Sequence, residues 1–500
     1  MSAPRRYRFG PLEQRGVVGP LRAGQVLIVA GAGAIALAAL YAFRDFAGLL
    51  IGIIVVGGAC ALVLAPIEGR TAEEWAPIVL RWLLRGRGSG AAFRATTPTA
   101  GINIGGGDSP KAEPCLPPEL GELTMLEVPY SRSTVGVIRD RRAGTYTAAL
   151  AVRAGAFGLR DWGEQEQKLQ AWGTVLASCG RDGSPVRRLQ WIETTLPGQG
   201  DELAAHFQAE RDRTVPFDSS VVRSYIELVE AAAPVTQEHE ILVVIQVDQR
   251  RGGREMRRLG GGDVGACEVL LREAEALAAN LAEAEVRVFG LLRPEQYAEA
   301  IRNAFDPFGR LGRSRVALAR GETDGVPPAL MGPTATEAAW GHFRSDSAVN
   351  ATYWISSWPR SDVGPLFMAP LLMQSTALRR VSVTIEPIPY SVALRRAEAA
   401  QTAEVAEELA RQKQGFITTA RTRRRQEAAA RREEELADGH AELRIAGFVS
   451  AYERSVEALE RGAPSVEHAA ALARLELRRL WGEQDSGFTY TLPLGRGLAP

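Results

Sequence analysis

Lysine is scarce in this chain, and its scarcity excludes one large class of enzymes. Of the 59 basic residues only Lys111, Lys168 and Lys413 are lysines, and none of them stands between a glycine and a serine or threonine. A Walker phosphate loop requires a lysine in that position, because its ammonium group neutralises the β- and γ-phosphates. We therefore expect this chain not to be a P-loop motor.

Histidine and cysteine are also few, and their spacing predicts no metal site. The five histidines form no HExxH motif and have no cysteine at zinc-ligand spacing. The four cysteines, Cys60, Cys115, Cys179 and Cys267, are too scattered for a metal pair or a disulfide framework. A GxSxG nucleophile elbow is absent too. We predict no catalytic residue, no cofactor and no metal.

A glycine triplet is a candidate for anion binding by the backbone. Gly260, Gly261 and Gly262 precede Asp263 and a predicted helix, so the N-terminus of that helix could in principle cradle an anion. No strand-GxGxxG-helix unit surrounds the triplet. A turn followed by the start of a helix is therefore the favoured interpretation.

Net charge is absent as well, since 59 basic and 59 acidic residues cancel. Global charge thus gives no argument for a polyanionic partner, and direct nucleic-acid binding is not expected. The strongest basic cluster is Arg421, Arg423, Arg424 and Arg425. It could meet DNA or anionic lipid, but glutamates interleave with it, and a solvated, salt-bridged helix is favoured.

Two long uncharged stretches are what the chain does have. They comprise 21 residues between Arg22 and Arg44 and 22 residues between Asp45 and Glu68. A helix of roughly 20 residues crosses a hydrocarbon core. Arginines flank the outer ends of the pair, which places both termini in the cytoplasm by the positive-inside rule. The pattern predicts a transmembrane helical hairpin in the inner (cytoplasmic) membrane, with the lipid bilayer as a partner.

Small residues in these stretches indicate close helix packing. Gly48 and Gly52 form a small-xxx-small pair, and Gly57 and Gly31 extend the smooth faces. Packing of the two spans on each other is favoured over contact with the helices of another protein. No Asp, Glu, Lys, Arg or His lies within either span, so the hairpin is expected to be an anchor or docking element rather than a transporter.

The rest of the chain predicts an α+β domain with a mixed or antiparallel sheet, because strands and helices are intermixed without strict alternation. An amphipathic helix with Trp75 and Trp82 precedes it, lying either at the membrane interface or on the domain. A run with only Gly415 as interruption predicts a helical arm of roughly 70 Å. The expected segments are a basic N-terminus (1–22), the hairpin (23–67, spans about 23–43 and 46–67), the amphipathic helix (68–88), a linker (89–119), the α+β domain (120–390), the arm (391–438) and a closing strand-helix-strand segment (439–500).

Several segments resemble known secretion proteins. The start YRFGPLEQRGVVGPLRAGQ, followed by the hairpin, resembles the actinobacterial two-span integral membrane proteins encoded with conjugative type IV secretion genes, which have a PrgI-like membrane module. Four further segments are similar to the N-terminal, non-motor domain of VirB-type conjugation ATPases: TYTAALAVRAGAFGLRDWGEQEQKLQAWGTVLA, RLQWIETTLPG, SSWPRSDVGPLFMAPLL and VSVTIEPIPYSVALRRAEA. The closing FTYTLPLG is similar to the segment that joins this domain to the motor.

The resemblance implies a membrane-anchored structural subunit of a conjugative type IV secretion system. Such a subunit would dock a separate VirB-type ATPase at the inner membrane, within an oligomeric assembly that includes other channel subunits. No catalytic residue is carried over, because the motor motifs are absent. Two alternatives stay open, an EccE-like membrane subunit of type VII secretion and a membrane-tethered enzyme. A deep cleft of converging carboxylates or histidines would favour the enzyme, and a ferredoxin-like sheet without one would favour the secretion subunit.

Overall fold

The computed structural model describes most of the chain, with gaps. The described residues are 23–42, 46–64, 70–85, 92–95, 114–153, 157–198, 219–232, 237–310, 325–373, 377–413 and 441–498, together with 68, 155, 215, 216, 434 and 439.

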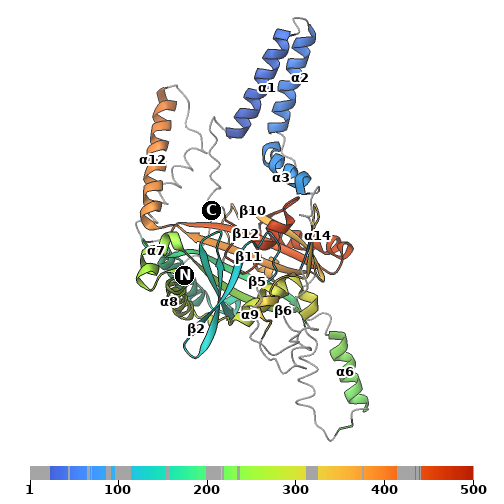
Figure 1. The fold of residues 1–500 in the computed structure, drawn as a ribbon, viewed down its shortest axis with the longest axis vertical. Helices are drawn as coiled ribbons and strands as arrows, with labels where there is room; N and C mark the ends of the chain where they lie inside the picture. Colours follow the sequence, from blue (N-terminus) through green and yellow to red (C-terminus); the bar gives the residue numbers. More distant parts are fainter. Residues whose placement is uncertain are drawn as a thin grey trace.

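One large antiparallel sheet organises the described residues (Figure 1). Its thirteen strands follow the order β1-β8-β9-β10-β12-β11-β5-β6-β4-β3-β2, with β7 paired to β4 and β13 paired to β10. The strands are β1 (Ala92–Arg94), β2 (Leu123–Tyr130), β3 (Ser133–Asp140), β4 (Thr145–Arg153), β5 (Val186–Pro197), β6 (Gln237–Asp248), β7 (Arg287–Leu291), β8 (Ala335–Ala338), β9 (Phe343–Ser345), β10 (Ala348–Ser357), β11 (Leu378–Pro387), β12 (Leu443–Glu453) and β13 (Glu476–Arg479).

Helices are distributed along the whole chain. They are α1 (Ala23–Ala42), α2 (Phe46–Leu64), α3 (Ala72–Arg85), α4 (Trp162–Cys179), α6 (Ser220–Ala232), α7 (Gln249–Arg258), α8 (Gly262–Glu283), α9 (Pro294–Phe305), α11 (Ala369–Leu372), α12 (Tyr390–Lys413), α14 (Val456–Leu472) and α15 (Gln484–Thr489). Short 3-10 turns cover Phe157–Leu159, Pro307–Gly309 and Pro328–Leu330.

The sheet is built from two units with the same strand and helix plan. In the first unit the chain order is β4-α4-β5-β6-α8-β7, and the strands lie in the order β7-β4-β6-β5. In the second unit the chain order is β10-α11-β11-β12-α14-β13, and the strands lie in the order β13-β10-β12-β11. Each unit thus consists of two split β-α-β motifs, which is the ferredoxin-like arrangement.

The two units join edge to edge through their equivalent strands β5 and β11. These strands pair antiparallel, with Trp191 opposite Val383 and Gln190 opposite Thr384. Trp191 packs against the apolar cores of both units, so both sets of helices cover the same face of the sheet. In the first unit this core consists of β4 and β6 residues against α4 and α8, and in the second unit of β10 and β12 residues against α14.

Alternation along the central strands sends polar side chains to the opposite face. Arg188, Gln190 and Thr194 alternate in β5 with the core residues Leu189 and Trp191. This second face is covered by α9, α15 and the last described residues of the chain, whose apolar side chains form a separate cluster with Ile192 and Val244. A polar sheet face under a covering segment requires hydrogen-bond partners, and these define the candidate site below.

Long insertions leave the sheet at corresponding points of the two units. The connection between β5 and β6 contains α6, and the connection between β11 and β12 contains α12. Figure 1 shows α6 and α12 projecting from opposite ends of the sheet. Of the predicted arm 391–438, the structure describes α12 as far as Lys413 and the single residue Glu434. The arginine cluster at 421–425 lies outside the described residues.

The N-terminal apolar stretches form the helices α1 and α2, which pack on each other above the sheet (Figure 1). In the part of the chain that the structure describes, no helix combines the length and the apolar character required to cross a membrane. This finding overturns the predicted transmembrane hairpin, the inner-membrane location and the cytoplasmic assignment of the termini.

The prediction counted every uncharged residue of a stretch as part of a membrane-spanning helix. The helices cover 20 and 19 residues instead of 21 and 22. Eleven of the 20 residues of α1 are Ala or Gly, whereas Leu, Ile, Phe and Val are the residues that favour insertion.

The predicted amphipathic helix forms as α3 and lies against the sheet domain. Trp75 stacks on Trp340 with ring centroids 5.9 Å apart, and Trp82 meets the same ring edge-on at 5.5 Å. Arg70, just before the helix, forms an ion pair of 3.0 Å with Glu483. The sequence left open whether this helix lies at a membrane interface or on the domain, and these contacts place it on the domain.

Residues 439–500 depart in part from the predicted strand-helix-strand order. The helix α14 begins after Ser455, whose side chain accepts from the Ala458 N–H. Pro464 lies inside it. The second strand predicted in this range, GFTYTLPLG, is instead the end of α15 followed by an irregular segment. Its polar and carbonyl groups bond to side chains of the sheet rather than to a neighbouring strand.

Candidate functional site

The most elaborate polar arrangement in the described residues holds residues 490–498 across the second face of the sheet. We call these residues the closing segment. Gln190 of β5 lies at its centre and is fully buried. The Gln190 amide nitrogen donates to the carbonyls of Tyr490 and Leu492 at 3.1 and 3.0 Å, and its oxygen accepts from the Gly495 N–H at 2.8 Å. One side chain thus bonds to three backbone groups of the closing segment.

Neighbouring strands extend this clamp along the segment. Gln246 of β6 donates to the Leu494 carbonyl at 2.9 Å, and Thr384 of β11 donates to the Arg496 carbonyl at 2.7 Å. Ser382 donates to the Tyr490 carbonyl at 3.0 Å. The three strands β6, β5 and β11 are adjacent in the sheet, so the closing segment runs across the junction of the two units.

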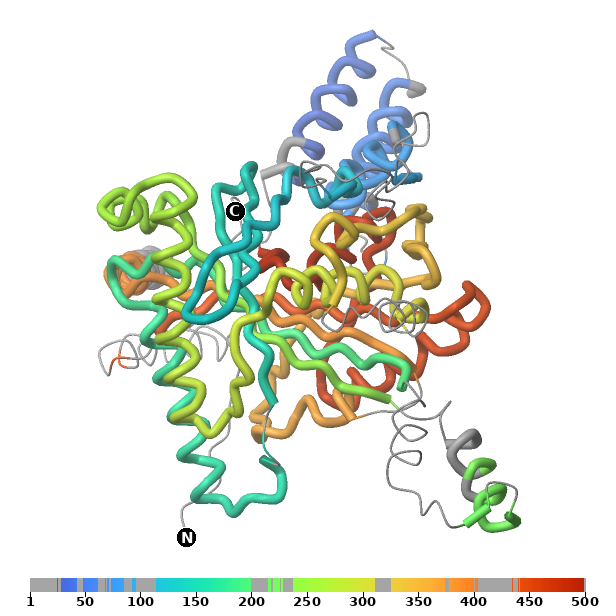
Figure 2. Tube along the Cα trace, turned by 60° about the horizontal axis from the view of Figure 1, so that its bottom comes forward, coloured from blue at the N-terminus to red at the C-terminus, as the bar shows by residue number. Residues whose placement is uncertain are grey.

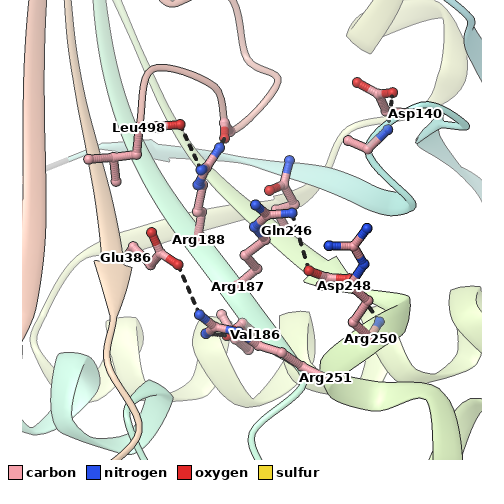
Figure 3. A network of polar contacts seen from close by, with 12 residues as sticks. Asp140, Val186, Arg187, Arg188, Gln246, Asp248, Arg250, Arg251, Glu386 and Leu498 are labelled. Carbon is pink, nitrogen blue, oxygen red and sulfur yellow. Dashed lines mark hydrogen bonds and ion pairs between the residues drawn. The ribbon is translucent and has the colours of Figure 1, made fainter. Parts of the chain in front are cut away.

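Arg188 completes the clamp and carries an unusual electrostatic environment. Its guanidinium donates to the carbonyls of Gly495 and Leu498 at 3.2 and 2.8 Å (Figure 3). Burial, followed by the charge of Arg187, lowers the pKa of Arg188 to about 10. Glycine is needed at the bend of the segment, because Gly495 has a backbone φ of +63° and a Cβ at this position would lie 2.9 Å from the Gln246 amide nitrogen.

Arginines outnumber carboxylates at this end of the sheet. Arg187 pairs with Asp248 at 3.2 Å, and Arg251 and Arg444 share Glu386 at 2.9 and 3.2 Å. Figure 3 shows Arg187, Asp248, Arg251 and Glu386 gathered near Leu498 and the first turn of α7. The pKa of Arg251 is lowered as well. Burial is the main cause, and the positive charges of Arg187 and Arg444 also disfavour its protonated form.

A groove of about 710 Å³ opens on the helical face of the second unit. The residues that line it are Ser361, Asp362, Val363, Gly364, Leu366, Phe367, Pro370, Leu472, Ala473 and Arg474. Leu366 and Leu472 are 48% and 61% exposed, although both are large apolar residues. We call this the groove surface. In the first unit the corresponding place is covered by the 18 residues of α4, whereas α11 has four.

The glycines predicted for helix packing fall into two groups. Gly52 faces the other helix, since a Cβ there would lie 3.4 Å from that of Ala36, and Gly48 is buried. Gly31 and Gly57 have no heavy atom within 4 Å of the position that a Cβ would occupy. Gly52 therefore packs within the hairpin, and Gly31 and Gly57 lie on its open faces.

The glycine triplet forms a turn before a helix, which is the interpretation that the sequence favoured. Gly261 is the N-cap residue of α8, and Asp263 occupies its first turn. The Asp263 carboxylate accepts from the Tyr146 hydroxyl at 2.7 Å and forms an ion pair with Arg139. A carboxylate of the chain itself thus lies where an anion would have bound.

Comparisons with known proteins add no family. No family model matches the chain, and no curated protein matches it. Among the described residues, no group of three or more His, Cys, Asp or Glu side chains could hold a metal ion.

The clamp around the closing segment was not predicted from the sequence, although the strands carry a signal for it. Arg188, Gln190 and Thr194 lie at even-numbered positions of β5, and Ser382 and Thr384 do so in β11. Such alternation indicates a polar sheet face. What covers that face could not be read from the strands, because the partner carbonyls lie between 108 and 310 residues away in the chain.

Proposed function

We propose that this protein is a non-enzymatic subunit of a conjugative type IV secretion system and that its sheet domain binds a separate VirB-type ATPase. The observation that supports the proposal is that the segments resembling the non-motor domain of such ATPases fold into one ferredoxin-like pair of units. These segments are spread over residues 145–495.

The contacts between these segments are direct. RLQWIETTLPG forms β5 and VSVTIEPIP forms β11, and the two strands pair at the centre of the sheet. SSWPRSDVGPLFMAPLL runs over the helical face, where a Cβ at Gly158 would lie 3.5 Å from Leu366. FTYTLPLG contributes to the closing segment held by Gln190. A resemblance scattered along the chain therefore corresponds to one contiguous piece of structure.

Protein binding is the chemistry that this arrangement suits. Most residues that line the groove surface belong to the resembling segment SSWPRSDVGPLFMAPLL, and the groove exposes Leu366 and Leu472 beside Arg474. The Arg474 guanidinium is held at its edge by the Ser361 hydroxyl at 2.8 Å. Apolar side chains rimmed by polar groups are typical of sites that bind another protein. The ATPase would supply the energy, and this domain would position it.

Co-purification tests the proposal. The tagged full chain is co-expressed with the VirB-type ATPase encoded in the same gene cluster, and the affinity eluate is resolved by size-exclusion chromatography. The proposal predicts one peak that contains both proteins. Elution of the two proteins in separate peaks at micromolar concentration would contradict it, as would co-purification of an unrelated ATPase at the same level.

A further inference from the structure

A strongly basic face lies on the first unit and is not used by the proposed function. It consists of the exposed arginines Arg141, Arg142, Arg250, Arg254, Arg257 and Arg258. We call these six residues the basic face. Four of them belong to α7, and two belong to the turn between β3 and β4. Figures 1 and 2 show α7 at the outer edge of the molecule, with one side directed away from the sheet.

The spacing of the α7 arginines places them on one side of the helix. Arg250, Arg254, Arg257 and Arg258 follow the i, i+4, i+7, i+8 pattern, whereas Gly252 and Met256 form the buried side. The turn with Arg141 and Arg142 is attached to the same helix. The Gln249 N–H donates to the Gly144 carbonyl at 3.1 Å, and its side chain donates to the Tyr146 hydroxyl at 3.0 Å.

Carboxylates near the basic face are already engaged elsewhere. Asp248 pairs with Arg187 at 3.2 Å, Glu255 pairs with Arg272 at 2.6 Å, and Asp263 pairs with Arg139. Within the described parts of the chain, none of the six arginines of the basic face forms an ion pair with a carboxylate. A net charge of zero for the whole chain thus conceals a concentrated positive surface.

We propose that the basic face binds the phosphate backbone of a nucleic-acid duplex. Interfaces between proteins have a core rich in apolar and aromatic side chains. The α7 segment QRRGGREMRR contains no aromatic residue, and its one large apolar residue, Met256, is buried. Lipid-surface helices require an apolar face too. Protein–DNA interfaces are distinguished by their positive charge, which is what this face offers.

The same composition distinguishes a duplex from a single strand. Proteins that bind single strands stack the bases on aromatic side chains, and α7 has none. A helix of this length extends over about 15 Å, and a duplex presents roughly nine phosphate charges over that distance. We therefore expect backbone contacts without sequence preference. The net-charge argument against nucleic-acid binding fails here because it averages over the whole surface.

Fluorescence anisotropy with the full chain and a labelled DNA duplex of random sequence tests the proposal. Binding should weaken steeply with salt, and the slope of log K against log salt should be about −4 if four or five phosphates are contacted. The variant Arg254→Gln/Arg257→Gln/Arg258→Gln should lower the affinity at least tenfold and reduce that slope by about 2.7. Substitution of the same three residues by lysine keeps the charge and should keep most of the affinity.

A matched control removes the same charge elsewhere. Arg132, Arg153 and Arg461 are exposed and lie outside the basic face, so their triple change to Gln should leave duplex binding unchanged. An equal loss in this control would overturn the proposal, because it would assign the binding to overall charge. Absence of duplex binding at low salt, or better competition by polyglutamate than by duplex, would also overturn it. None of these measurements requires the ATPase, so they can fail independently of the proposed function.

Discussion

The two ferredoxin-like units share one order of strands and helices, and they differ in the length and number of their helices. In the first unit α4 has 18 residues and α7 is inserted between β6 and α8. In the second unit α11 has four residues and α14 follows β12 after two residues. The groove surface lies beside the short helix α11 of the second unit, and α7, which the second unit lacks, carries four of the six arginines of the basic face in the first unit. Each candidate binding surface therefore lies where one unit departs from the other.

The elements that the two units share form the hydrophobic cores, whereas the candidate binding surfaces lie on elements that differ between them. The shared strands and the helices α8 and α14 form the cores, and Trp191 joins those cores at the boundary. The closing segment crosses the same boundary on the other face. We expect changes at the shared elements to alter the free energy of unfolding. Changes at the groove surface or at the basic face should affect binding alone.

The largest effect is expected for alanine at a helix glycine in the first unit. A Cβ at Gly265 of α8 would lie 2.0 Å from the Met256 carbonyl oxygen, whereas at Gly462 of α14 its nearest neighbour is Ala377 at 3.7 Å. Gly265→Ala should lower the free energy of unfolding by about 3 kcal/mol through overpacking of α7 on α8. Gly462→Ala should raise it by up to about 1 kcal/mol through helix propensity. Urea unfolding of both variants measures the difference, and equal effects would contradict the comparison.

Loss of the clamp residue should come next. Gln190→Leu leaves the Tyr490 and Leu492 carbonyls and the Gly495 N–H without this partner. We expect a loss of about 2 kcal/mol and faster hydrogen exchange in the closing segment. The control is Gln165→Leu, which removes bonds to the carbonyls of Phe157 and Arg160 at the surface and should cost less than about 1 kcal/mol. Unchanged exchange in the Gln190 variant would contradict the clamp.

Charge placed in the groove should weaken ATPase binding without affecting the fold. Leu366→Asp/Leu472→Asp should reduce the affinity at least tenfold, equivalent to about 1.4 kcal/mol, as measured by interferometry with the purified ATPase. Val264→Asp/Phe289→Asp changes two apolar residues of the first unit that are 67% and 55% exposed and should leave the affinity unchanged. The opposite ranking would assign docking to the first unit.

The smallest effect concerns acid sensitivity at the start of α8. The ion pair with Arg139 holds the pKa of the Asp263 carboxyl below its ordinary value of 3.8. Because the folded-state pKa is the lower one, the associated stability is present above pH 3.8 and is lost as the pH falls through the folded value. The stability difference between wild type and Asp263→Asn should therefore shrink below about pH 4. A constant difference from pH 7 to pH 2 in unfolding experiments would contradict this.

Parts of this fold were accessible from the sequence, and others depended on distant contacts. The strands of the second half, such as RRVSVTIEPI, are recognisable because β-branched residues alternate with polar ones. The equivalence of the two units could not be recognised, because equivalent strands such as β5 and β11 have different residues and only their order in the sheet relates them. The basic face could not be predicted from the sequence either. Whether the arginines of α7 form ion pairs depends on which partners the nearby carboxylates have in the folded chain.

The N-terminal stretches illustrate the opposite error. Their composition is the strongest single signal in the sequence, yet in the first stretch a count of uncharged residues does not distinguish leucine from the alanine and glycine that dominate α1. For the tryptophans of α3 the sequence allowed either a membrane interface or contact with the domain. Their stacking on Trp340 decides for the domain. A residue far away in the chain supplied the missing information.

The central claim is that the two units bind different partners, the second through the groove surface and the first through the basic face. One chromatographic series tests it directly: co-elution of the ATPase with the wild type, with Leu366→Asp/Leu472→Asp and with Arg254→Gln/Arg257→Gln/Arg258→Gln. We predict that the groove variant loses the ATPase and that the basic-face variant retains it at the wild-type level. Loss of the ATPase from both variants, or from neither, would contradict the claim.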